Sequence, residues 1–244
     1  MAVPRFLVLG ALAVGASVLL PSASSHHARR VLRLRADDPL ILFDGKGSEF
    51  EAVFAPDPLN TSRSYATITR GGPVDREALI RITLVQALSS QDKLDWLVEK
   101  AVELGAHRIV LAPAARSLVR LSGPRRERRA DRWREIAVAA CCQCGRNRLP
   151  SIEISDHLET ALRSAQDSSA RWILDPGAQS GLHRASGDSV TCAVGPEGGF
   201  TAEELALAHS LRYAGARLGR RVLRTETAGL VAVSALLAFH GEFA

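Results

Sequence analysis

A glycine-rich loop is the first feature of this sequence with the residue types to bind a small molecule. Gly195-Pro196-Glu197-Gly198-Gly199-Phe200 follows the apolar run 190–194. Glycines allow a backbone to approach a ligand closely, and they leave N–H and C=O groups free to read an adenine edge or a carboxylate. The spacing matches neither the dinucleotide fingerprint nor a Walker loop. The loop therefore predicts a binding site of another kind, with a simple tight turn as the alternative.

A second loop, at residues 218–228, combines arginines, hydroxyl groups and a carboxylate just before an apolar segment. Thr225 and Glu226 are residue types that cap a helix N-terminus, which is a purely structural explanation for both. Capping explains the hydroxyl groups, but it does not explain Arg224. This loop is therefore a second candidate for function.

An alternating pattern of strands and helices would position both loops. From residue 79 onward, apolar runs alternate with amphipathic segments, which indicates a parallel sheet with helical crossovers. We expect strands at 80–87, 108–112, 172–174, 190–194 and 216–218, and helices at 92–104, around Trp133, from Thr201 through Tyr213, and at 225–239. Ligands in such sheets bind at the carboxyl ends of the strands, where both loops fall. The last helix is apolar nearly all round, so it is buried in the core or packs against a second subunit.

The first seventy residues have a different character, with short extended runs and turn signals such as Asp44-Gly45-Lys46-Gly47. They predict a small β-barrel or sheet domain. Residues 6–20 imitate a secretory signal, but Gly10, Gly15 and Pro21 favour an N-terminal strand pair of a folded domain. Arg70-Gly71-Gly72-Pro73 interrupts the extended pattern, so we place the domains at 1–70 and 75–244.

Composition narrows the class of protein. The chain has 244 residues, 46% of them hydrophobic, which is enough for one or two cores and excludes a wholly disordered protein. The net charge is +5, and arginines cluster in the segment 119–134, which suits a polyphosphate partner or a solvated helix face. Four cysteines, three of them at 141, 142 and 144, form no disulfide framework and indicate a reducing compartment. Their spacing does not suit a tetrahedral metal site, so we predict no bound metal.

Motifs along nearly the whole chain resemble the bacterial 16S rRNA (uracil-N3)-methyltransferases of the RsmE type, in the SPOUT superfamily. Besides both loops, they are Val3-Pro4-Arg5-Phe6, His26-His27, Arg30-Val31-Leu32-Arg33, Asp44-Gly45-Lys46-Gly47, Lys93, Glu99-Lys100-Ala101, Glu103-Leu104-Gly105, Arg116-Ser117, and Trp133 leading to Gly145-Arg146-Asn147-Arg148-Leu149-Pro150. The resemblance is weakest at 112–115 and 151–189.

The resemblance implies an α/β fold: a PUA-like β-barrel that grips RNA, followed by a SPOUT domain with a trefoil knot. It also implies S-adenosyl-L-methionine as cofactor, a homodimer, ribosomal RNA of the small subunit as partner, a cytoplasmic location and no membrane association. The cofactor residues it implies are Leu174, Val194, Gly195, Pro196, Glu197, Gly198, Leu218, Gly219, Leu223, Thr225 and Ala228. The RNA-binding residues are Arg5, His26, His27, Arg30, Arg33, Arg116, Arg146, Asn147 and Arg148.

Catalysis at N3 of uridine requires removal of a proton or stabilisation of the resulting anion. On their position beside the loop, we expect Arg224 to stabilise a uracil oxygen anion and Glu226 to accept the proton. Two alternatives are a related SPOUT enzyme with another target atom and a non-catalytic rRNA-binding assembly factor, because a fold alone does not determine function. A third, a secreted binding protein, requires the segment 6–20 to be cleaved.

Overall fold

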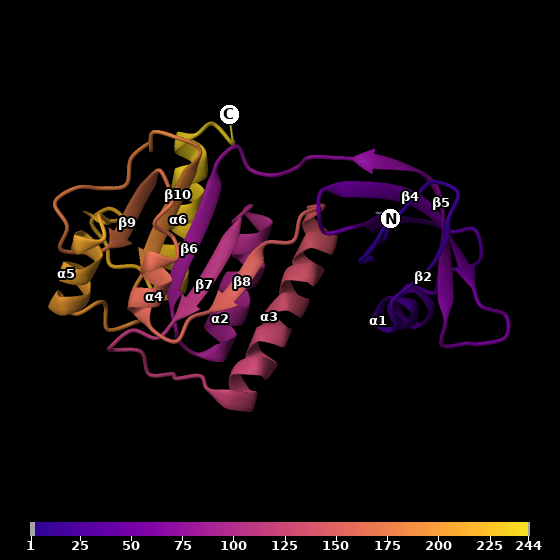
Figure 1. Ribbon diagram of the computed structural model, residues 1–244, viewed down its shortest axis with the longest axis horizontal. Helices are drawn as coiled ribbons and strands as arrows, with labels where there is room; N and C mark the ends of the chain where they lie inside the picture. The colour runs from indigo at the N-terminus through magenta and orange to yellow at the C-terminus, as the bar shows by residue number, and fades with distance from the viewer. Residues whose placement is uncertain (1–2, 244) are drawn as a thin grey trace. The chain divides into compact units, whose positions relative to one another are not determined.

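The computed structural model describes residues 3–243. The chain folds into two compact units. The first comprises residues 1–77 and 141–149, and the second comprises 78–140 and 150–244. The long helix α3 (Gly123–Cys144) contributes its last residues to the first unit. Figure 1 labels the helices and strands of both units.

The first unit contains a five-stranded sheet in the order β1-β3-β4-β5-β2. Its strands are β1 (Arg5–Leu7), β2 (Ser17–Leu19), β3 (Pro39–Phe43), β4 (Ser48–Pro56) and β5 (Ser64–Pro73). Alternate side chains point to one face and form an apolar core that includes Leu40, Leu42 and Phe54. The turn expected at residues 44–47 does join β3 to β4, and the Asp44 carboxylate accepts hydrogen bonds from the backbone N–H groups of Lys46 and Ser48.

Three details of this unit differ from the sequence predictions. Strands β1 and β2 do not pair with each other, because β1 pairs with β3 and β2 with β5. His26 and His27 lie in a short helical segment, α1 (Ser22–His26) followed by the π-helical turn η1 (His27–Val31), although the first seventy residues were expected to be extended runs and turns. Strand β5 continues through Gly71 and Gly72, where a Cβ on Gly71 would collide with the ring of Phe50. Gly71 therefore allows the close approach of Phe50, and neither glycine ends the strand.

The segment after α3 belongs to the first unit because it pairs with the β3–β4 turn. Asn147 C=O accepts a hydrogen bond from Gly47 N–H, and Leu149 N–H donates to Gly45 C=O. A backbone bridge also joins Lys46 to Arg148. Pairing between segments a hundred residues apart leaves no periodic signal in the sequence. The linear division at residues 70–75 therefore placed 141–149 in the other domain.

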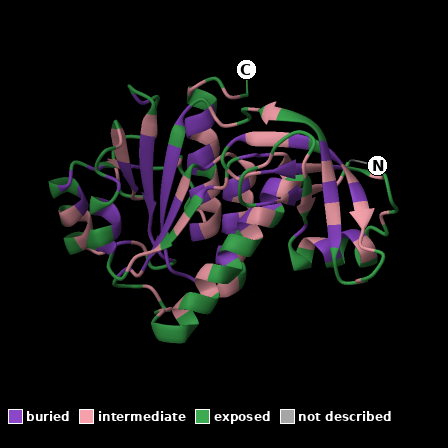
Figure 2. Ribbon diagram, turned by 45° about the vertical axis from the view of Figure 1, so that its right-hand side comes forward, coloured by how far each residue is buried: buried purple, intermediate pink, exposed green. Residues whose placement is uncertain are grey.

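The second unit contains a six-stranded parallel sheet in the order β11-β9-β10-β6-β7-β8. The strands are β6 (Arg81–Ala87), β7 (Arg108–Ala112), β8 (Ser151–Ile154), β9 (Ala170–Leu174), β10 (Ser189–Val194) and β11 (Ala214–Ala216). The expected parallel sheet with helical crossovers is confirmed, and Figure 2 shows its central strands to be almost entirely buried.

Helices cover both faces of this sheet. On one face α2 (Gln91–Glu103) and α6 (Thr225–Phe239) pack together, with Gly229 of α6 close to Leu84 and Gln86 of β6. On the other face α4 (Leu158–Arg163) and α5 (Ala202–Ser210) pack on a core that includes Val85 and Ile173. Leu84 and Val85 are consecutive, so they point to opposite faces of the sheet. The lack of a side chain on Gly229 allows α6 to approach the sheet closely.

The sequence missed β8 and α4 because both are short and only partly apolar. Strand β11 was placed two residues late, since its residues Ala214-Gly215-Ala216 include no β-branched or aromatic side chain. Helix α6 has the expected bounds, and the capping box of Thr201 and Glu204 is present at α5. Within residues 3–243, no helix has both the length and the apolar character needed to cross a membrane. Threading of the chain into a knot stays a prediction.

Candidate functional site

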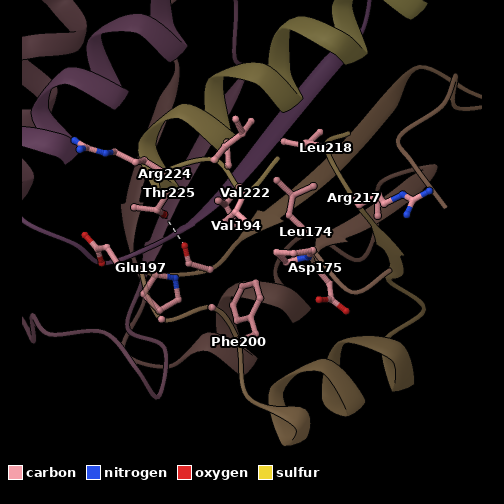
Figure 3. A pocket seen from close by; sticks show the side chains of 18 of the residues that line it. Leu174, Asp175, Val194, Glu197, Phe200, Arg217, Leu218, Val222, Arg224 and Thr225 are labelled. Atoms are coloured by element: carbon pink, nitrogen blue, oxygen red, sulfur yellow. Dashed lines mark hydrogen bonds between the residues drawn. The ribbon is translucent and has the colours of Figure 1, made fainter. Parts of the chain in front are cut away.

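A pocket of about 680 Å³ lies where β9, β10 and β11 end. These strands run parallel, so their carboxyl ends meet at one edge of the sheet. Figure 3 shows Leu174, Val194 and Leu218 around the cavity, with Phe200 on its far side. All eleven residues that the sequence assigned to a cofactor line this pocket, as does Arg224. The two loops that the sequence singled out are therefore neighbours in space.

A buried hydroxyl group joins the two loops. Thr225 Oγ1 donates to Gly195 C=O at 2.5 Å and accepts from Gln86 Nε2 at 2.8 Å. Thr225 is only 5% exposed, so water does not compete for these partners. Arg224 occupies the N-cap position of α6 and makes no side-chain cap hydrogen bond. The simple capping explanation of Thr225 is therefore wrong: its hydroxyl fixes the glycine loop against the helix.

The glycine loop is held from its other side by Arg116. The Arg116 guanidinium donates to Gly198 C=O at 2.7 Å, and its aliphatic carbons lie where a Cβ on Gly198 would be about 3.2 Å away. Gly199 has a φ of +69°, a conformation that a residue with a Cβ adopts at a cost. The loop therefore has little room for a larger side chain at position 198, and its backbone conformation favours glycine at position 199.

Acidic and basic groups gather at one edge of the pocket. Lys93 Nζ lies 2.7 Å from Glu197 Oε1 and 3.8 Å from Glu226 Oε2. Burial alone would raise the pKa of Glu197, but the hydrogen bond from Lys93, a backbone hydrogen bond and the charge of Lys93 together hold that pKa below its usual value. The same hydrogen bond raises the pKa of Lys93. Glu226 is 12% exposed, and its Oε2 accepts no hydrogen bond from residues 3–243.

Arg224 is exposed at the same edge, and Figure 3 shows its side chain on the Glu197 side of the cavity. Lys93 and Arg224 both line the pocket, and the charge of Arg224 slightly opposes the rise in the pKa of Lys93. Glu226 does not line the cavity itself. The structure thus brings the two predicted catalytic residues to the pocket's edge, with Lys93 beside them.

Sequence reasoning missed several residues that line the pocket. They are Lys93, Asp175, Pro176, Gly199, Phe200, Leu205, Ala216, Arg217, Arg220, Arg221 and Val222. Asp175 directly follows β9, so the rule that ligands bind at the carboxyl ends of parallel strands could have found it. Lys93 comes from α2, 104 residues before Glu197 in the sequence. No local sequence pattern indicates that its side chain reaches the pocket.

Three of the residues predicted to bind RNA are engaged inside the first unit. Arg5 donates to Glu49 Oε2 at 2.7 Å and to Asn147 Oδ1 at 2.5 Å, and its guanidinium lies over the ring of Phe43. Asn147 is 1% exposed and also donates to Val74 C=O. Arg146 is 4% exposed and pairs with Glu77. These contacts give all three side chains a structural role, and RNA contact by them stays a prediction.

The other predicted RNA contacts are accessible. His26, His27, Arg30, Arg33 and Arg148 are exposed on the first unit, and Arg116 is exposed in the second. His26 and Arg30 also line a second cavity of about 390 Å³, together with Arg29 and Arg63. His27, another of the predicted RNA contacts, packs edge-on against Phe6. The first unit therefore presents a basic hollow beside α1.

Comparison with known proteins agrees with this arrangement. Residues 76–237 match the model of an RNA methyltransferase domain, and residues 20–56 match that of an RNA methyltransferase PUA domain. The ribosomal RNA small subunit methyltransferase E of Bacillus subtilis is 30% identical over 221 residues, which cover 86% of each chain. That of Neisseria gonorrhoeae, solved bound to S-adenosyl methionine, is 33% identical over the full length of both chains with a TM-score of 0.87. A Legionella pneumophila structure with bound S-adenosylmethionine is 29% identical with a TM-score of 0.90 and covers 98% of each chain.

The parallel sheet with its glycine-loop pocket and the separate PUA-like unit define a two-domain RNA methyltransferase. The 30% identity over most of the Bacillus subtilis protein makes the placement more specific. The chain belongs to the family of the ribosomal RNA small subunit methyltransferase E proteins.

Proposed function

We propose that this protein transfers a methyl group from S-adenosyl-L-methionine to N3 of a specific uridine in small-subunit (16S) ribosomal RNA. The observation that carries the proposal is the meeting of the two loops, 195–200 and 218–225, in one pocket with Arg224 and Glu226 at its edge. Family membership supports the reaction class, and the relative from Neisseria gonorrhoeae supports the methyl donor.

The pocket's chemistry fits an adenosine joined to a charged thioether. Leu174, Val194 and Leu218 offer apolar contacts to a planar base, and the glycine loop offers backbone hydrogen-bonding groups. Asp175 and Glu197 supply negative charge for a cationic ligand. The cavity of about 680 Å³ falls within the range of small-molecule sites. When bound, the donor supplies an activated methyl group.

The protein's own residues then have two tasks, alignment and charge stabilisation. Thr225 holds the glycine loop in place from within, and Arg116 holds it from outside. Arg224, exposed at the edge, is placed to stabilise negative charge on a uracil oxygen. Glu226, near Lys93, is placed to accept the N3 proton directly or through water. No residue in these roles requires a metal ion.

In this proposal, exposed basic residues of the first unit bind the RNA. His26, His27, Arg30, Arg33 and Arg148 are exposed there and supply donors for phosphate oxygens. Arg116 and the arginines at 217, 220 and 221 add positive charge around the pocket. The substrate is ribosomal RNA, either free or within the small ribosomal subunit, and the reaction takes place in the cytoplasm.

We also propose that the protein forms a homodimer. Along α6, Val231 and Phe239 are 39% and 41% exposed, while Trp96 of the adjoining α2 is 46% exposed. Large apolar side chains exposed on two helices that pack together favour coverage by another subunit. A second copy of the chain is the proposed partner. Sedimentation of the purified protein tests this part separately.

The proposal is tested with the protein, labelled S-adenosylmethionine and small-subunit ribosomal RNA. Arg224→Ala should lower the turnover about 100-fold or more and leave the cofactor dissociation constant unchanged, because Arg224 acts on the base. Unchanged turnover would remove Arg224 from catalysis. RNA binding without any cofactor binding would identify an assembly factor, and a methyl group on another atom would identify a related enzyme.

A further inference from the structure

Four arginines lie along one side of the first turns of α3. Arg125, Arg128, Arg129 and Arg132 follow the spacing i, i+3, i+4, i+7, which places side chains on one stripe of a helix. At a rise of 1.5 Å per residue, the stripe is about 10 Å long. The buried side of the helix, marked by Trp133, Ala137 and Ala140, lies beside it. We call these four residues the arginine stripe.

Within residues 3–243, only one of the four arginines of the stripe forms an ion pair. Arg132 pairs with Asp95 of α2 at 2.7 Å. Within residues 3–243, Arg125 and Arg128 are exposed and make no side-chain hydrogen bond or ion pair. The Nη1 atom of Arg129 is buried and without a hydrogen-bond partner in the same part of the chain. Two of the four guanidinium groups, those of Arg125 and Arg128, therefore have exposed donors available for another molecule.

The arginine stripe destabilises helix α3. The N-terminal end of a helix carries partial positive charge, and the first turn of α3 contains no acidic residue to offset it. Arg125 and Arg129, like Arg128 and Arg132, are four residues apart, a spacing at which like charges repel. Burial lowers the pKa of Arg129, and the charges of Arg125 and Arg132 lower it further against the attraction of Asp95.

A charged surface that costs stability is explained most directly by a partner that neutralises it. Guanidinium groups form paired hydrogen bonds with phosphate oxygens, and a regular row of them matches the repeating charge of a nucleic-acid backbone. Figure 2 shows the first turns of α3 mostly exposed, so a large ligand can reach them. The stripe lies outside the residues that line the pocket.

We propose that the arginine stripe of α3 is a second RNA-binding surface, which holds the sugar–phosphate backbone of the substrate at a distance from the methyl-transfer pocket. This inference rests on the proposed function in taking ribosomal RNA as the partner. Its contribution is sequence-independent, because phosphate contacts position an RNA without reading its bases. Neutralisation of the stripe by phosphates also removes the repulsion within α3.

The test compares two triple variants with the unaltered protein. R125Q/R128Q/R129Q removes three charges from the stripe. R81Q/R134Q/R163Q removes three charges from exposed ion pairs elsewhere, and Arg134 lies about 180° around α3 from the stripe. Filter binding measures the affinity for in vitro transcribed small-subunit ribosomal RNA between 50 and 200 mM salt, and calorimetry measures S-adenosylmethionine binding.

The stripe variant should bind RNA at least about tenfold more weakly, with a salt-dependence slope reduced by about 2 to 3, because each phosphate contact contributes slightly less than one to that slope. Its melting temperature should equal or exceed that of the unaltered protein, and S-adenosylmethionine binding should not change. The control variant should bind RNA with the original slope to within about one.

Equal slopes for the stripe variant and the unaltered protein would overturn the inference. It would also be overturned if free RNA bound normally while the assembled small subunit bound weakly, since the stripe would then contact a ribosomal protein. Because filter binding needs no methyl transfer, an inactive protein with the expected slopes would contradict only the proposed reaction.

Discussion

The hydroxyl group of Thr225 connects the glycine loop to the core, and its removal is expected to weaken both stability and cofactor binding. Thr225→Val keeps the shape of the side chain but leaves Gly195 C=O without this donor. Gln86 Nε2 also loses its acceptor at 2.8 Å and keeps only Ala87 C=O at 3.3 Å. Gln86 is fully buried, so water does not replace the lost hydrogen bonds and the free energy of unfolding falls.

The expected magnitude follows from these contacts. A buried polar group left without its partner costs about 1–3 kcal/mol. Gln86 keeps a second acceptor, so the total should be about 2 kcal/mol. In a domain of this size that corresponds to a fall in melting temperature of about 4–8 °C. If about 1.4 kcal/mol of this free energy is lost from the loop conformation that binds the cofactor, the dissociation constant for S-adenosylmethionine rises about tenfold.

Thermal unfolding and titration calorimetry measure the two effects. Thr225→Ser is the matched control, because it keeps the hydroxyl group and should retain most of the stability and affinity. If Thr225→Val matched the unaltered protein in both melting temperature and dissociation constant, the loop would not depend on this hydrogen bond and the reasoning would be refuted.

Three further outcomes are expected. The Arg76 hydrogen bond, reinforced by Arg5, lowers the pKa of Glu49 to about 2, so stability should be lost as the pH falls from 4.5 toward 2. Glu49→Gln should flatten that dependence in acid unfolding, and an unchanged curve would exclude this network. Lys93→Met should raise the pKa of Glu197 and move the acidic limb of the pH–rate profile to higher pH; no movement would show that Lys93 does not act on Glu197 in this way. Phe239→Glu should shift sedimentation toward monomer, whereas an intact dimer would place the interface elsewhere.

The second unit was the more predictable part of the fold. Its buried central strands β6, β7 and β10 are largely apolar runs, and a capping box marks the start of α5. Local patterns of this kind are readable because burial and helix ends impose them directly. The same holds for the two pocket loops, which directly follow a strand or precede a helix.

Contacts between distant segments were the part that could not be predicted. Arg5 and Asn147 read as exposed RNA-binding residues, yet they hydrogen-bond each other inside the first unit. Lys93 reaches Glu197 across more than a hundred residues. A sequence pattern reports which side of an element faces the core, but it does not report which distant element covers it. Thr225 looked like a helix cap for the same reason.

The central claim is methyl transfer to N3 of uridine, and nucleoside mass spectrometry tests it most directly. Small ribosomal subunits from a strain lacking this gene are incubated with the purified protein and S-adenosylmethionine carrying a heavy methyl group, then digested and analysed. One heavy 3-methyluridine per subunit, at a single position, is expected. A heavy methyl group on a ribose or another base, or none at all, would contradict it.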